Sequence, residues 1–484
     1  MSDIAFLAAT ELARMVRHRE ISCVELLQHY LDRADRFNGE LNAIVVDIRE
    51  QALVDARRAD EAVACGAELG PLHGVPMTVK EAYNVAGTPT TWGNPNWLGN
   101  VPDTDAVVIR KLKQAGVIIF GKTNVPLMLG DFQSYNDIYG TSNNPYDLSR
   151  TPGGSSGGAA AALAAGLTGI ESGSDIGGSI RNPAHYCGVF GHKPTHDLIW
   201  MRGYCPPGVH YARPDISVVG PMARSAGDLA VSLKVMASPD DIKARGFQWH
   251  LPDLGGRKLG DLKVAVWKDS DLCPVSNEVS TRVEAVADAF RAAGAVVDEN
   301  ARPDIDVSRS SETFALLLNA TLSSRLPEEI YGSLQAGAAL LDPGDQRPEA
   351  KNLRAQVATF RQWSQANEFR HQMRWQWHAF FEDFDILIAP IMPTAAFLHD
   401  HRDFSERSIR VDEIEMPYFD QVFWAGLTGV SYLPSTAIPT GLNTEGLPVG
   451  VQIVGPEYGD LITIGVAQLL EDAGFCFEPP EEFI

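Results

Sequence analysis

The chain is poor in the features that mark secreted, membrane-spanning and metal-clustering proteins. It has 484 residues but only six cysteines, none of them in CxxC spacing, so a disulfide framework is not indicated and a reducing cytoplasm is expected. No apolar run approaches the roughly 18 residues that a membrane span needs. The first twenty residues also lack a basic start followed by an apolar segment. We therefore expect a cytoplasmic protein without a membrane partner.

Basic side chains are also scarce relative to acidic ones. The chain has 40 Lys and Arg against 62 Asp and Glu, a net charge of −22 at pH 7. Such a negative field repels phosphate backbones and anionic membrane surfaces. We expect no nucleic-acid partner.

The histidines form no recognisable metal set. His192 and His196 have i, i+4 spacing, but Pro194 forbids a continuous helix between them. The segment His399–Asp403 is mostly charged and is typical of an exposed turn, while His73 alone is expected to be a packed histidine. Without ligand spacing and a matching carboxylate, the sequence predicts neither a metal nor a cofactor.

Hydrophobic periodicity in the first half predicts an α/β fold. Residues 1–64 have helical patterns, with a capping box over Ser22–Glu25. Gly74–Lys80 is a short apolar run, Asp105–Ala115 is helical, and Val117–Phe120 is a second apolar run. This alternation of strand, helix and strand is typical of a sheet covered by helices.

The second half repeats the alternation. Strands are expected over 262–267, 295–298, 385–390 and 447–454, a helix over 277–293, a loop over 206–216, and mostly helix over 305–380. No internal repeat and no linker composition interrupts the chain. A single domain over residues 1–484 is therefore expected, although its length alone would favour two.

What the chain has in abundance is glycine and serine in two neighbouring clusters. GGSSGG spans Gly153–Gly158, and GSDIGGSIR spans Gly173–Arg181 with Ser179 inside it. Crowded glycines leave backbone N–H groups uncovered and let a reacting carbonyl approach closely. Two clusters joined by a segment of Ala, Gly and Leu predict a serine hydrolase that acts on amide-like bonds.

Three side chains are the catalytic candidates, and each has a simpler structural interpretation. Lys80 ends an apolar run, where burial would lower its pKa and make a neutral amine available as a base; the alternative is a solvated strand end. For Ser155 the alternative is a turn residue that caps a helix starting near Gly158. For Ser179 it is a glycine-rich turn without chemistry.

Two familiar motifs are present without their structural context. Residues 116–123 fit GxxxxGK[ST], but the middle residues Val117–Phe120 are the expected strand, which argues against phosphate binding. GxSxG occurs twice, centred on Ser155 and Ser156. A nucleophile elbow needs an apolar strand before the serine, and the polar segment 144–152 does not supply one. An α/β-hydrolase using Ser156 stays as an alternative.

Taken together, these stretches resemble the amidase signature family. The resemblance runs from GSSGG through GSDIGGSIRNPAHYCGVFGHKPT (Gly173–Thr195), and continues at Gly220–Ala230, Asp385–Ala396 and Gly446–Gly455. It is strongest over residues 70–230, the signature core. It implies an α/β fold with a large mixed central β-sheet sandwiched between helices.

The resemblance also implies roles for individual residues. Ser179 would be the nucleophile, Ser155 the bridging serine after a cis Gly154–Ser155 peptide bond, and Lys80 the base. The oxyanion hole would be formed by backbone N–H groups of Ile176, Gly177, Gly178 and Ser179. Supporting residues would be Asp175, Arg181 and Ser156. The implied reaction is hydrolysis of a carboxylic amide, or of a carbamate or ester, through a covalent acyl-enzyme.

The substrate is less sharply implied. Many relatives carry a glutamate where this chain has Leu127, and His192 stands where an apolar residue is expected. The loop 127–136 is expected to border the pocket. Pocket residues would be Gly130, Asp131, Phe132, Gln133 and Tyr204. The helical segment 305–380, with Trp363, Trp375 and Trp377, would form a funnel for a hydrophobic or aromatic small-molecule amide or carbamate.

Two other functions remain open at this point. A glutamyl-tRNA amidotransferase-like subunit would need partner chains and a Ser-Ser-Leu-Asp-Gln-like stretch, where this chain has YARPDISVVGP (Tyr211–Pro221). A catalytically silent scaffold would keep the fold without the chemistry. The sequence does not determine the oligomeric state, and a homodimer is one assembly that it leaves open.

Overall fold

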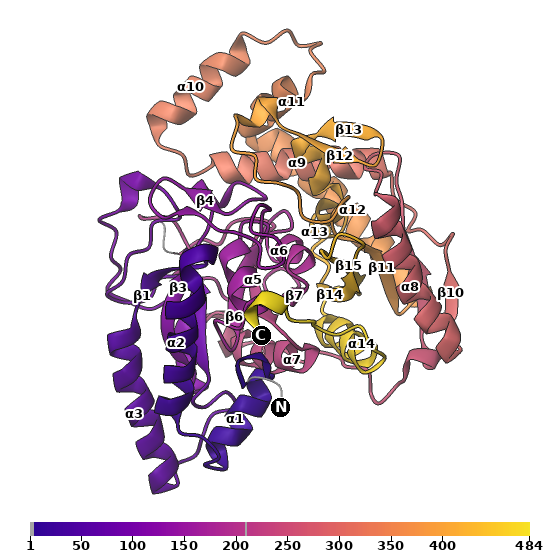
Figure 1. Cartoon of the computed structure of the whole chain (residues 1–484). Helices are drawn as coiled ribbons and strands as arrows, with labels where there is room; N and C mark the ends of the chain where they lie inside the picture. The colour runs from indigo at the N-terminus through magenta and orange to yellow at the C-terminus, as the bar shows by residue number, and fades with distance from the viewer. Residues whose placement is uncertain (1–3, 209–210) are drawn as a thin grey trace.

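The computed structural model describes residues 4–208 and 211–484. Its centre is a mixed sheet of eight strands in the order β10-β9-β11-β15-β14-β7-β8-β6 (Figure 1). The strands are β6 (Glu171–Asp175), β7 (Phe190–Lys193), β8 (Val218–Ala223), β9 (Lys263–Val266), β10 (Val296–Asp298), β11 (Ile386–Pro390), β14 (Ser435–Leu442) and β15 (Pro448–Val454). Strand β9 pairs in parallel with β10 and β11, and the remaining pairs are antiparallel.

A second sheet of three strands continues the first. Its order is β1 (Ile44–Asp47), β3 (Ile118–Thr123) and β2 (Pro76–Lys80), with β2 parallel to β3. An isolated parallel bridge between Met77 and Ile170 joins β2 to the residue before β6. Strand β2 therefore runs beside β6, and both strands end toward the same region.

Helices cover both faces of the large sheet. Along β11, Ile386 and Ile388 join the core under α7 (Ala226–Met236), α8 (Asn277–Ala293) and α14 (Asp460–Asp472). Leu387 and Ala389 join a cluster with α12 (Phe360–Asp383) and α13 (Phe423–Gly429). Successive side chains of a strand point to opposite faces, so both faces are buried. The covering helices also include α5 (Gly157–Ala164) and α6 (Arg181–Tyr186). The predicted mixed sheet between helices is confirmed.

The N-terminal region is mostly helical, as predicted, with one correction. Helices α1 (Ala9–Arg17), α2 (Cys23–Leu41) and α3 (Arg49–Cys65) are present, and the Ser22–Glu25 capping box forms at the start of α2. The prediction of helix throughout residues 1–64 is wrong at β1. Its β-branched Ile-Val-Val run pairs antiparallel with β3, and such residues favour strands.

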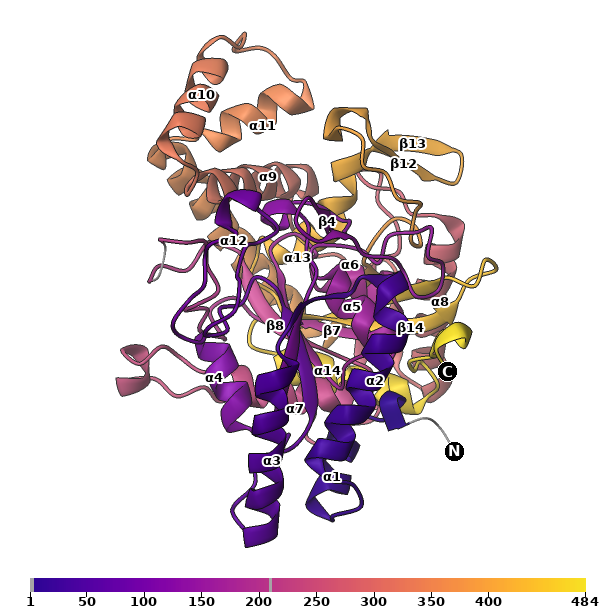
Figure 2. The ribbon, with the colours of Figure 1, turned by 60° about the vertical axis from the view of Figure 1, so that its left-hand side comes forward.

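Helices α9–α11 form a lobe at one end of the molecule, and the long helix α12 leads from it back to the large sheet. Their bounds are α9 (Val307–Ser323), α10 (Glu328–Ala339), α11 (Pro348–Gln356) and α12 (Phe360–Asp383). Figures 1 and 2 both show α10 and α11 standing away from the sheets, beyond α9. A hairpin of β12 (Ser408–Val411) and β13 (Ile414–Pro417) lies at the same end (Figure 2). The predicted helical segment 305–380 is confirmed.

The remaining predicted elements lie close to their expected bounds. Helix α4 spans Val107–Gln114, and short strands β4 (Tyr135–Asn136) and β5 (Gly140–Thr141) follow β3. Within the described ranges, no helix has both the length and the apolar character needed to cross a membrane.

Candidate active site

The fold brings Lys80, Ser155 and Ser179 together from three separate segments. Lys80 is the last residue of β2, Ser155 precedes α5, and Ser179 lies in the turn between β6 and α6. The exposed fractions are 0% for Lys80, 1% for Ser155 and 7% for Ser179. Of these two serines, Ser179 is the one that solvent reaches.

The ammonium end of Lys80 is surrounded by serine hydroxyls. Its Nζ lies 2.7 Å from Ser155 Oγ, 2.9 Å from Ser156 Oγ and 2.9 Å from Ser174 Oγ. Burial lowers the pKa of Lys80 well below its ordinary value, against the opposing charges of Asp175 and Glu171. The interpretation of Lys80 as a solvated strand end is therefore wrong. A neutral amine at this position can accept a proton.

Ser155 is held for contact with Lys80, not for helix capping. The peptide bond between Gly154 and Ser155 is cis, and Gly154 N donates to Asn182 Oδ1 at 2.9 Å. Helix α5 begins at Gly157 with Ser156 at the N-cap position, without a side-chain capping bond. The helix-capping interpretation of Ser155 is wrong because Ser156, and not Ser155, occupies the N-cap position of α5.

The turn that carries Ser179 depends on glycine. Gly178 has φ = +110°, a conformation that L side chains rarely adopt, and a Cβ there would lie 3.1 Å from Ala425 Cβ. The amide of Ser156 donates to the carbonyl of Ser179 at 3.2 Å, which ties the two serine clusters together. Among the described residues, no hydrogen bond joins Ser179 Oγ to Ser155 Oγ. Catalytic contacts of this kind often tighten only when substrate binds.

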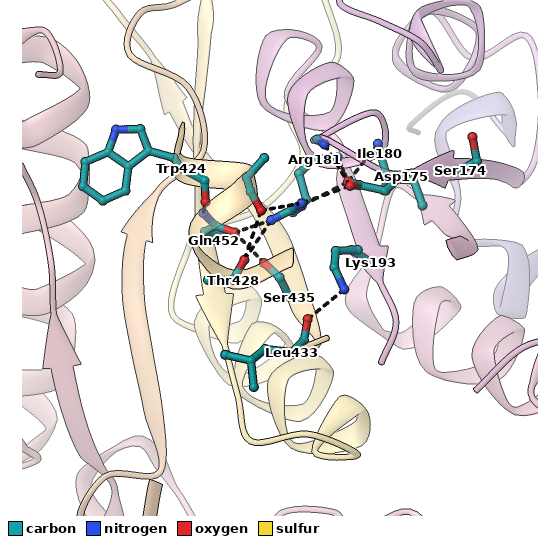
Figure 3. A network of polar contacts seen from close by, with 12 residues as sticks. Ser174, Asp175, Ile180, Arg181, Lys193, Trp424, Thr428, Leu433, Ser435 and Gln452 are labelled. Carbon is teal, nitrogen blue, oxygen red and sulfur yellow. Dashed lines mark hydrogen bonds and ion pairs between the residues drawn. The ribbon is translucent and has the colours of Figure 1, made fainter. Parts of the chain in front are cut away.

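A buried ion pair fixes the same turn from behind. Asp175 Oδ1 and Oδ2 accept from Arg181 Nη2 and Nε, both at 3.0 Å. Burial alone would raise the pKa of Asp175, but the Arg181 charge and these bonds hold it at about 2. Figure 3 shows Arg181 between Asp175 on one side and Thr428 and Gln452 on the other. These contacts hold the turn and leave neither side chain facing Ser179 as a proton carrier.

Backbone N–H groups of the turn differ in their availability. Gly178 N donates to Asp175 Oδ1 at 2.8 Å, so the expectation that all four N–H groups are free for an oxyanion does not hold for Gly178. The N–H groups of Ile176, Gly177 and Ser179 have no hydrogen-bond partner within the described part of the chain. Those are the donors left to bind a developing negative charge.

Apolar side chains border these donors. A Cβ added to Gly177 would lie 3.2 Å from Val422 Cγ2 and 3.9 Å from Phe314 Cζ, and one added to Gly178 would lie 3.8 Å from Phe132 Cε1. Phe132 also contacts Tyr418 and Phe419, with ring centroids 6.2 Å apart in both pairs. The surroundings of the donors are thus aromatic and aliphatic.

The five predicted pocket residues lie in different places. Phe132 borders the turn, and Gly130 is exposed. The polar groups of the other three are engaged elsewhere: Asp131 with Arg407 and Tyr418, Gln133 with the Asp400 backbone, and Tyr204 with Ser174. The loop itself passes the site closely, since a Cβ on Gly154 would lie 2.4 Å from the Asp131 carbonyl oxygen.

Other contacts of the site have weak signals in the sequence. Phe314 and Val422 lie far from the glycine clusters along the chain, and nothing in their local sequence marks them. Ser174 falls inside the GSDIGGSIR cluster, but nothing there distinguishes it from the neighbouring serines. Of the funnel tryptophans, Trp375 is 72% exposed while Trp377 is fully buried in the core, so the two do not share one lining.

The GxxxxGK[ST] match and the histidines His192 and His73 prove to be structural. Residues Ile118–Thr123 are a fully buried strand, and Lys122 Nζ donates to the Pro89 carbonyl and to Thr90 Oγ1. His192 bonds Thr436 Oγ1 and Asp460 Oδ1, and His73 is buried beside the Ala59 carbonyl. Within the described ranges, no strand leads directly into Ser156, and no group of three or more His, Cys, Asp or Glu side chains is placed to hold a metal ion.

A separate cavity of about 530 Å³ lies beside the start of α4. Its lining includes Arg110, Arg202 and Tyr211 but neither Ser155 nor Ser179. Gly203 and Cys205, the neighbours of Tyr204, also line it. The cavity is therefore distinct from the serine–lysine site.

Comparison with known proteins yields one consistent result. The family model described as Amidase matches residues 25–463. Indoleacetamide hydrolase from Bradyrhizobium diazoefficiens is 34% identical, over 96% of this chain and 86% of that protein. The A subunit of glutamyl-tRNA(Gln) amidotransferase from Chromohalobacter salexigens is 32% identical, over 96% of each. A bacterial aryl acylamidase of the amidase signature family has the same fold, with a TM-score of 0.81 at 24% identity over 99% of this chain and 97% of that one.

Proposed function

Because this chain belongs to the amidase family, we propose that it hydrolyses carboxylic amides through a covalent acyl-enzyme on Ser179. Lys80 is the base, Ser155 passes the proton between them, and the N–H groups of Ile176, Gly177 and Ser179 bind the oxyanion. The role of Lys80 is supported by its burial and its contact with Ser155, whereas the nucleophile and bridging roles and the bond type rest on the family.

One observation carries the proposal. A lysine is completely buried with its Nζ against Ser155, Ser156 and Ser174. Burying an ammonium with only neutral partners in hydrogen-bond contact costs free energy. The neutral amine avoids that cost, and it is the form that can take a proton from a serine. The arrangement thus has a chemical use and little structural benefit.

The first half of the reaction makes the acyl-enzyme. Ser179 Oγ attacks the amide carbonyl, and its proton passes to Ser155 Oγ while the Ser155 proton passes to Lys80 Nζ. The carbonyl oxygen gains the negative charge and binds the free N–H groups of the turn. One such donor is typically worth about 3 kcal/mol of transition-state stabilisation.

Collapse of the tetrahedral intermediate breaks the C–N bond. An amine is a poor leaving group unless it is protonated, and the Lys80 ammonium returns its proton through Ser155 to the departing nitrogen. Water then attacks the carbonyl of the Ser179 ester, and its proton passes through Ser155 to Lys80. When the ester C–O bond breaks, Lys80 returns this proton through Ser155 to Ser179 Oγ, and the carboxylic acid leaves. Lys80 ends the cycle neutral.

The surroundings of the turn favour a small aromatic amide as substrate. Phe132, Phe314 and Val422 border the N–H donors, and Phe404 and Phe419 lie beyond Phe132, 46% and 40% exposed. Apolar walls around a few polar groups are typical of ligand sites. Similarity to indoleacetamide hydrolase points in the same direction. We therefore propose aryl and arylacetic primary amides, with carbamates and esters as slower or secondary substrates.

The second candidate function is that of a glutamyl-tRNA amidotransferase-like subunit, and it has less support than amide hydrolysis. That function needs partner chains, and the segment Tyr211–Pro221 lacks the stretch expected for it. Within that segment, the Asp215 carboxylate accepts hydrogen bonds from the side chains of Arg370 and Tyr432. Hydrolysis of a small amide by the isolated chain would favour the hydrolase.

Intact mass after a serine-directed fluorophosphonate, followed by peptide mapping, tests the proposal. We expect one adduct, on Ser179, that is absent in Ser179→Ala and strongly slowed in Lys80→Met. Lys122→Met is the matched control, because it also removes a buried lysine from a neighbouring strand. An adduct on Ser156 would instead support an α/β-hydrolase, and folded protein without any adduct would support a silent scaffold.

Three further proposals concern the whole chain. A cytoplasmic location is supported by the six cysteines, all free in the structure. A single domain is supported by the bridge between β2 and the large sheet. A homodimer is proposed as the assembly, which light scattering of the purified protein would test.

A further inference from the structure

Tyr204 lies against the catalytic region although it belongs to a surface loop. Its loop is fixed by backbone bonds from Asn84 N to Gly203 O at 3.0 Å and from Val107 N to Arg202 O at 2.9 Å. A Cβ on Gly203, which has φ = +86°, would lie 2.5 Å from Ala106 Cα. The loop can therefore approach α4 this closely only with glycine before Tyr204. The tyrosine is 4% exposed.

Aromatic contacts and one short hydrogen bond direct the Tyr204 side chain. Its ring lies 4.7 Å from the ring of Tyr83 and 5.4 Å from that of Trp92. Its hydroxyl donates to Ser174 Oγ at 2.6 Å, and the same oxygen lies 2.9 Å from Lys80 Nζ. Tyr204, Ser174 and Lys80 thus form a continuous hydrogen-bonded chain.

The protonation state of Lys80 decides whether this chain is cooperative. When Lys80 is neutral, Tyr204 donates to Ser174, and in the resting enzyme Ser174 can donate its own proton to the single lone pair of the amine. That lone pair leaves Ser174 and accepts the Ser155 proton during the reaction. When Lys80 is an ammonium, it donates to Ser174 as well, and the Ser174 oxygen accepts both hydrogen bonds with its two lone pairs. Hydrogen bonds in sequence strengthen one another. Two donors to one oxygen do not.

We propose that Tyr204 is a positioning residue for Lys80: acting through Ser174, its hydroxyl favours the neutral form of the amine and fixes its place beside Ser155. This inference rests on the proposed function, in which Lys80 is the base. Tyr204 touches neither substrate nor the reacting atoms in this role.

Other charged and titratable groups face the same network. Asp175 and Glu171, from β6, both favour the ammonium form of Lys80. Glu81 faces Tyr204, and burial raises the pKa of Tyr204, so its hydroxyl stays protonated as a donor at neutral pH. From the start of α5, Ser155 and Ser156 contribute only neutral hydroxyls. The Tyr204 hydroxyl therefore favours the neutral form of Lys80, against the carboxylates of Asp175 and Glu171, which favour the ammonium form.

The test compares two buried tyrosines that contact each other. Tyr204→Phe removes the hydroxyl in the chain, whereas Tyr83→Phe removes a hydroxyl that bonds Ser172 and the Gly173 carbonyl but not Ser174. In the pH profile of kcat/KM for an arylacetic amide, the limb that falls at low pH reports the protonation of Lys80. We expect Tyr204→Phe to move this acid limb to higher pH by roughly half a unit. Tyr83→Phe should leave that limb in place. A merely structural role would lower the rate without moving the limb.

A second variant covers the case in which Tyr204→Phe does not fold. Site-specific 3-fluorotyrosine at position 204 keeps the hydroxyl and makes it a stronger donor, so the acid limb should move to lower pH. In a Ser174→Ala background, neither change at position 204 should shift the limb further. Limbs that stay at the wild-type pH in every position-204 variant would overturn the inference.

Failure of the inference is distinguishable from failure of the proposed function. If the inference alone fails, wild-type protein still hydrolyses amides and is labelled at Ser179 in a Lys80-dependent way, while position 204 has no effect on the limb. If the proposed function fails, the wild-type protein shows neither activity nor labelling at Ser179, and the inference falls with it.

Discussion

The ends of the neighbouring strands β2 and β3 carry two buried lysines that point to opposite faces of the sheet and have very different surroundings. The strands are parallel, with Lys80 opposite Thr123 and Val79 opposite Lys122. Both lysines are fully buried. Lys122 donates to the Pro89 carbonyl and to Thr90 Oγ1, whereas Lys80 meets the hydroxyls of Ser155, Ser156 and Ser174. Burial is the same, and the partners differ.

The partners determine which form of each amine the site accepts. A carbonyl can only accept, so the Pro89 carbonyl requires an N–H donor, and Lys122 supplies one. A hydroxyl can also donate, so the serines around Lys80 suit a neutral amine with a lone pair. Burial lowers the pKa of Lys122 to about 8, with Glu81 opposing the change, and Lys122 therefore stays charged at pH 7. Burial alone does not make a lysine a base.

The largest expected effect separates the two lysines by activity. Lys80→Met should lower kcat/KM for an aryl amide by about 10⁴-fold, the upper range for general acid–base catalysis, because the proton is both taken up and returned by this group. Circular dichroism should show a folded protein. Residual activity within tenfold of wild type would contradict the role of Lys80.

The next effect separates two steps served by the same lysine. In Lys80→Ala, hydrolysis of an ester with a good leaving group should suffer about 10²-fold less than hydrolysis of the matched amide, because only the amine must be protonated to leave. Parallel kinetics on an ester and amide of the same acid provide the measurement. Equal losses of hydrolysis rate on both substrates would contradict proton delivery by Lys80 to the leaving amine.

Substitution of Lys122 should lower the stability of the protein and leave its chemistry intact. Lys122→Met leaves the Pro89 carbonyl and Thr90 without their donor and removes the positive charge near the buried carboxylate of Glu81. We expect a loss of about 2–3 kcal/mol in the free energy of unfolding, typical of a hydrogen bond to a charged group. Urea denaturation gives this value. The folded fraction should keep its Ser179 chemistry, and a catalytic defect as deep as that of Lys80→Met would erase the distinction.

The remaining effect is a pH dependence of stability. The pKa of Lys80 is lower in the folded protein than in the unfolded chain, where it is about 10.4. Between these values the unfolded chain binds the extra proton, so wild-type stability rises with pH and falls as pH falls. Lys80→Met lacks this dependence. Its stability relative to wild type should therefore increase as pH is lowered from about 10, by at most about 1.4 kcal/mol per pH unit.

Urea denaturation of both proteins across pH 7–10 gives that difference directly. Other titrating groups cancel because the two proteins share them. A difference that stays constant with pH would mean that Lys80 keeps its charge in the folded protein.

Local signals in the sequence were sufficient to predict a helix or strand where the residues of that segment alone determine its structure. Helix α8 begins at Asn277 and ends at Ala293 as predicted, because Ser276 caps it and Gly294 ends it with φ = +93°. The strand ending at Lys80 was recognisable from its apolar run. Strand β6, with the sequence ESGSD, has no such run, and it forms because β8 pairs with it on one side and β2 lies on the other.

The site itself was predictable only in part. The glycine–serine clusters and the family resemblance led to Ser179, Ser155 and Lys80, which the structure brings into one place. The partners of Lys80 and the apolar border depend on contacts between distant segments. Tyr204 was expected in the pocket but donates to Ser174, and Phe314 reaches the turn because Gly426 leaves room for its ring.

The protonation state of Lys80 is the most direct test of the proposed mechanism. NMR of protein labelled with ¹³C at the lysine Cε carbon, assigned with Lys80→Met, follows each amine through a pH titration. We predict that at pH 7 the Lys80 signal is that of the neutral amine, whereas the Lys122 signal is that of the ammonium form. A Lys80 signal that stays in the ammonium form up to pH 10 would contradict the claim that the serine-lined end of β2 holds a base.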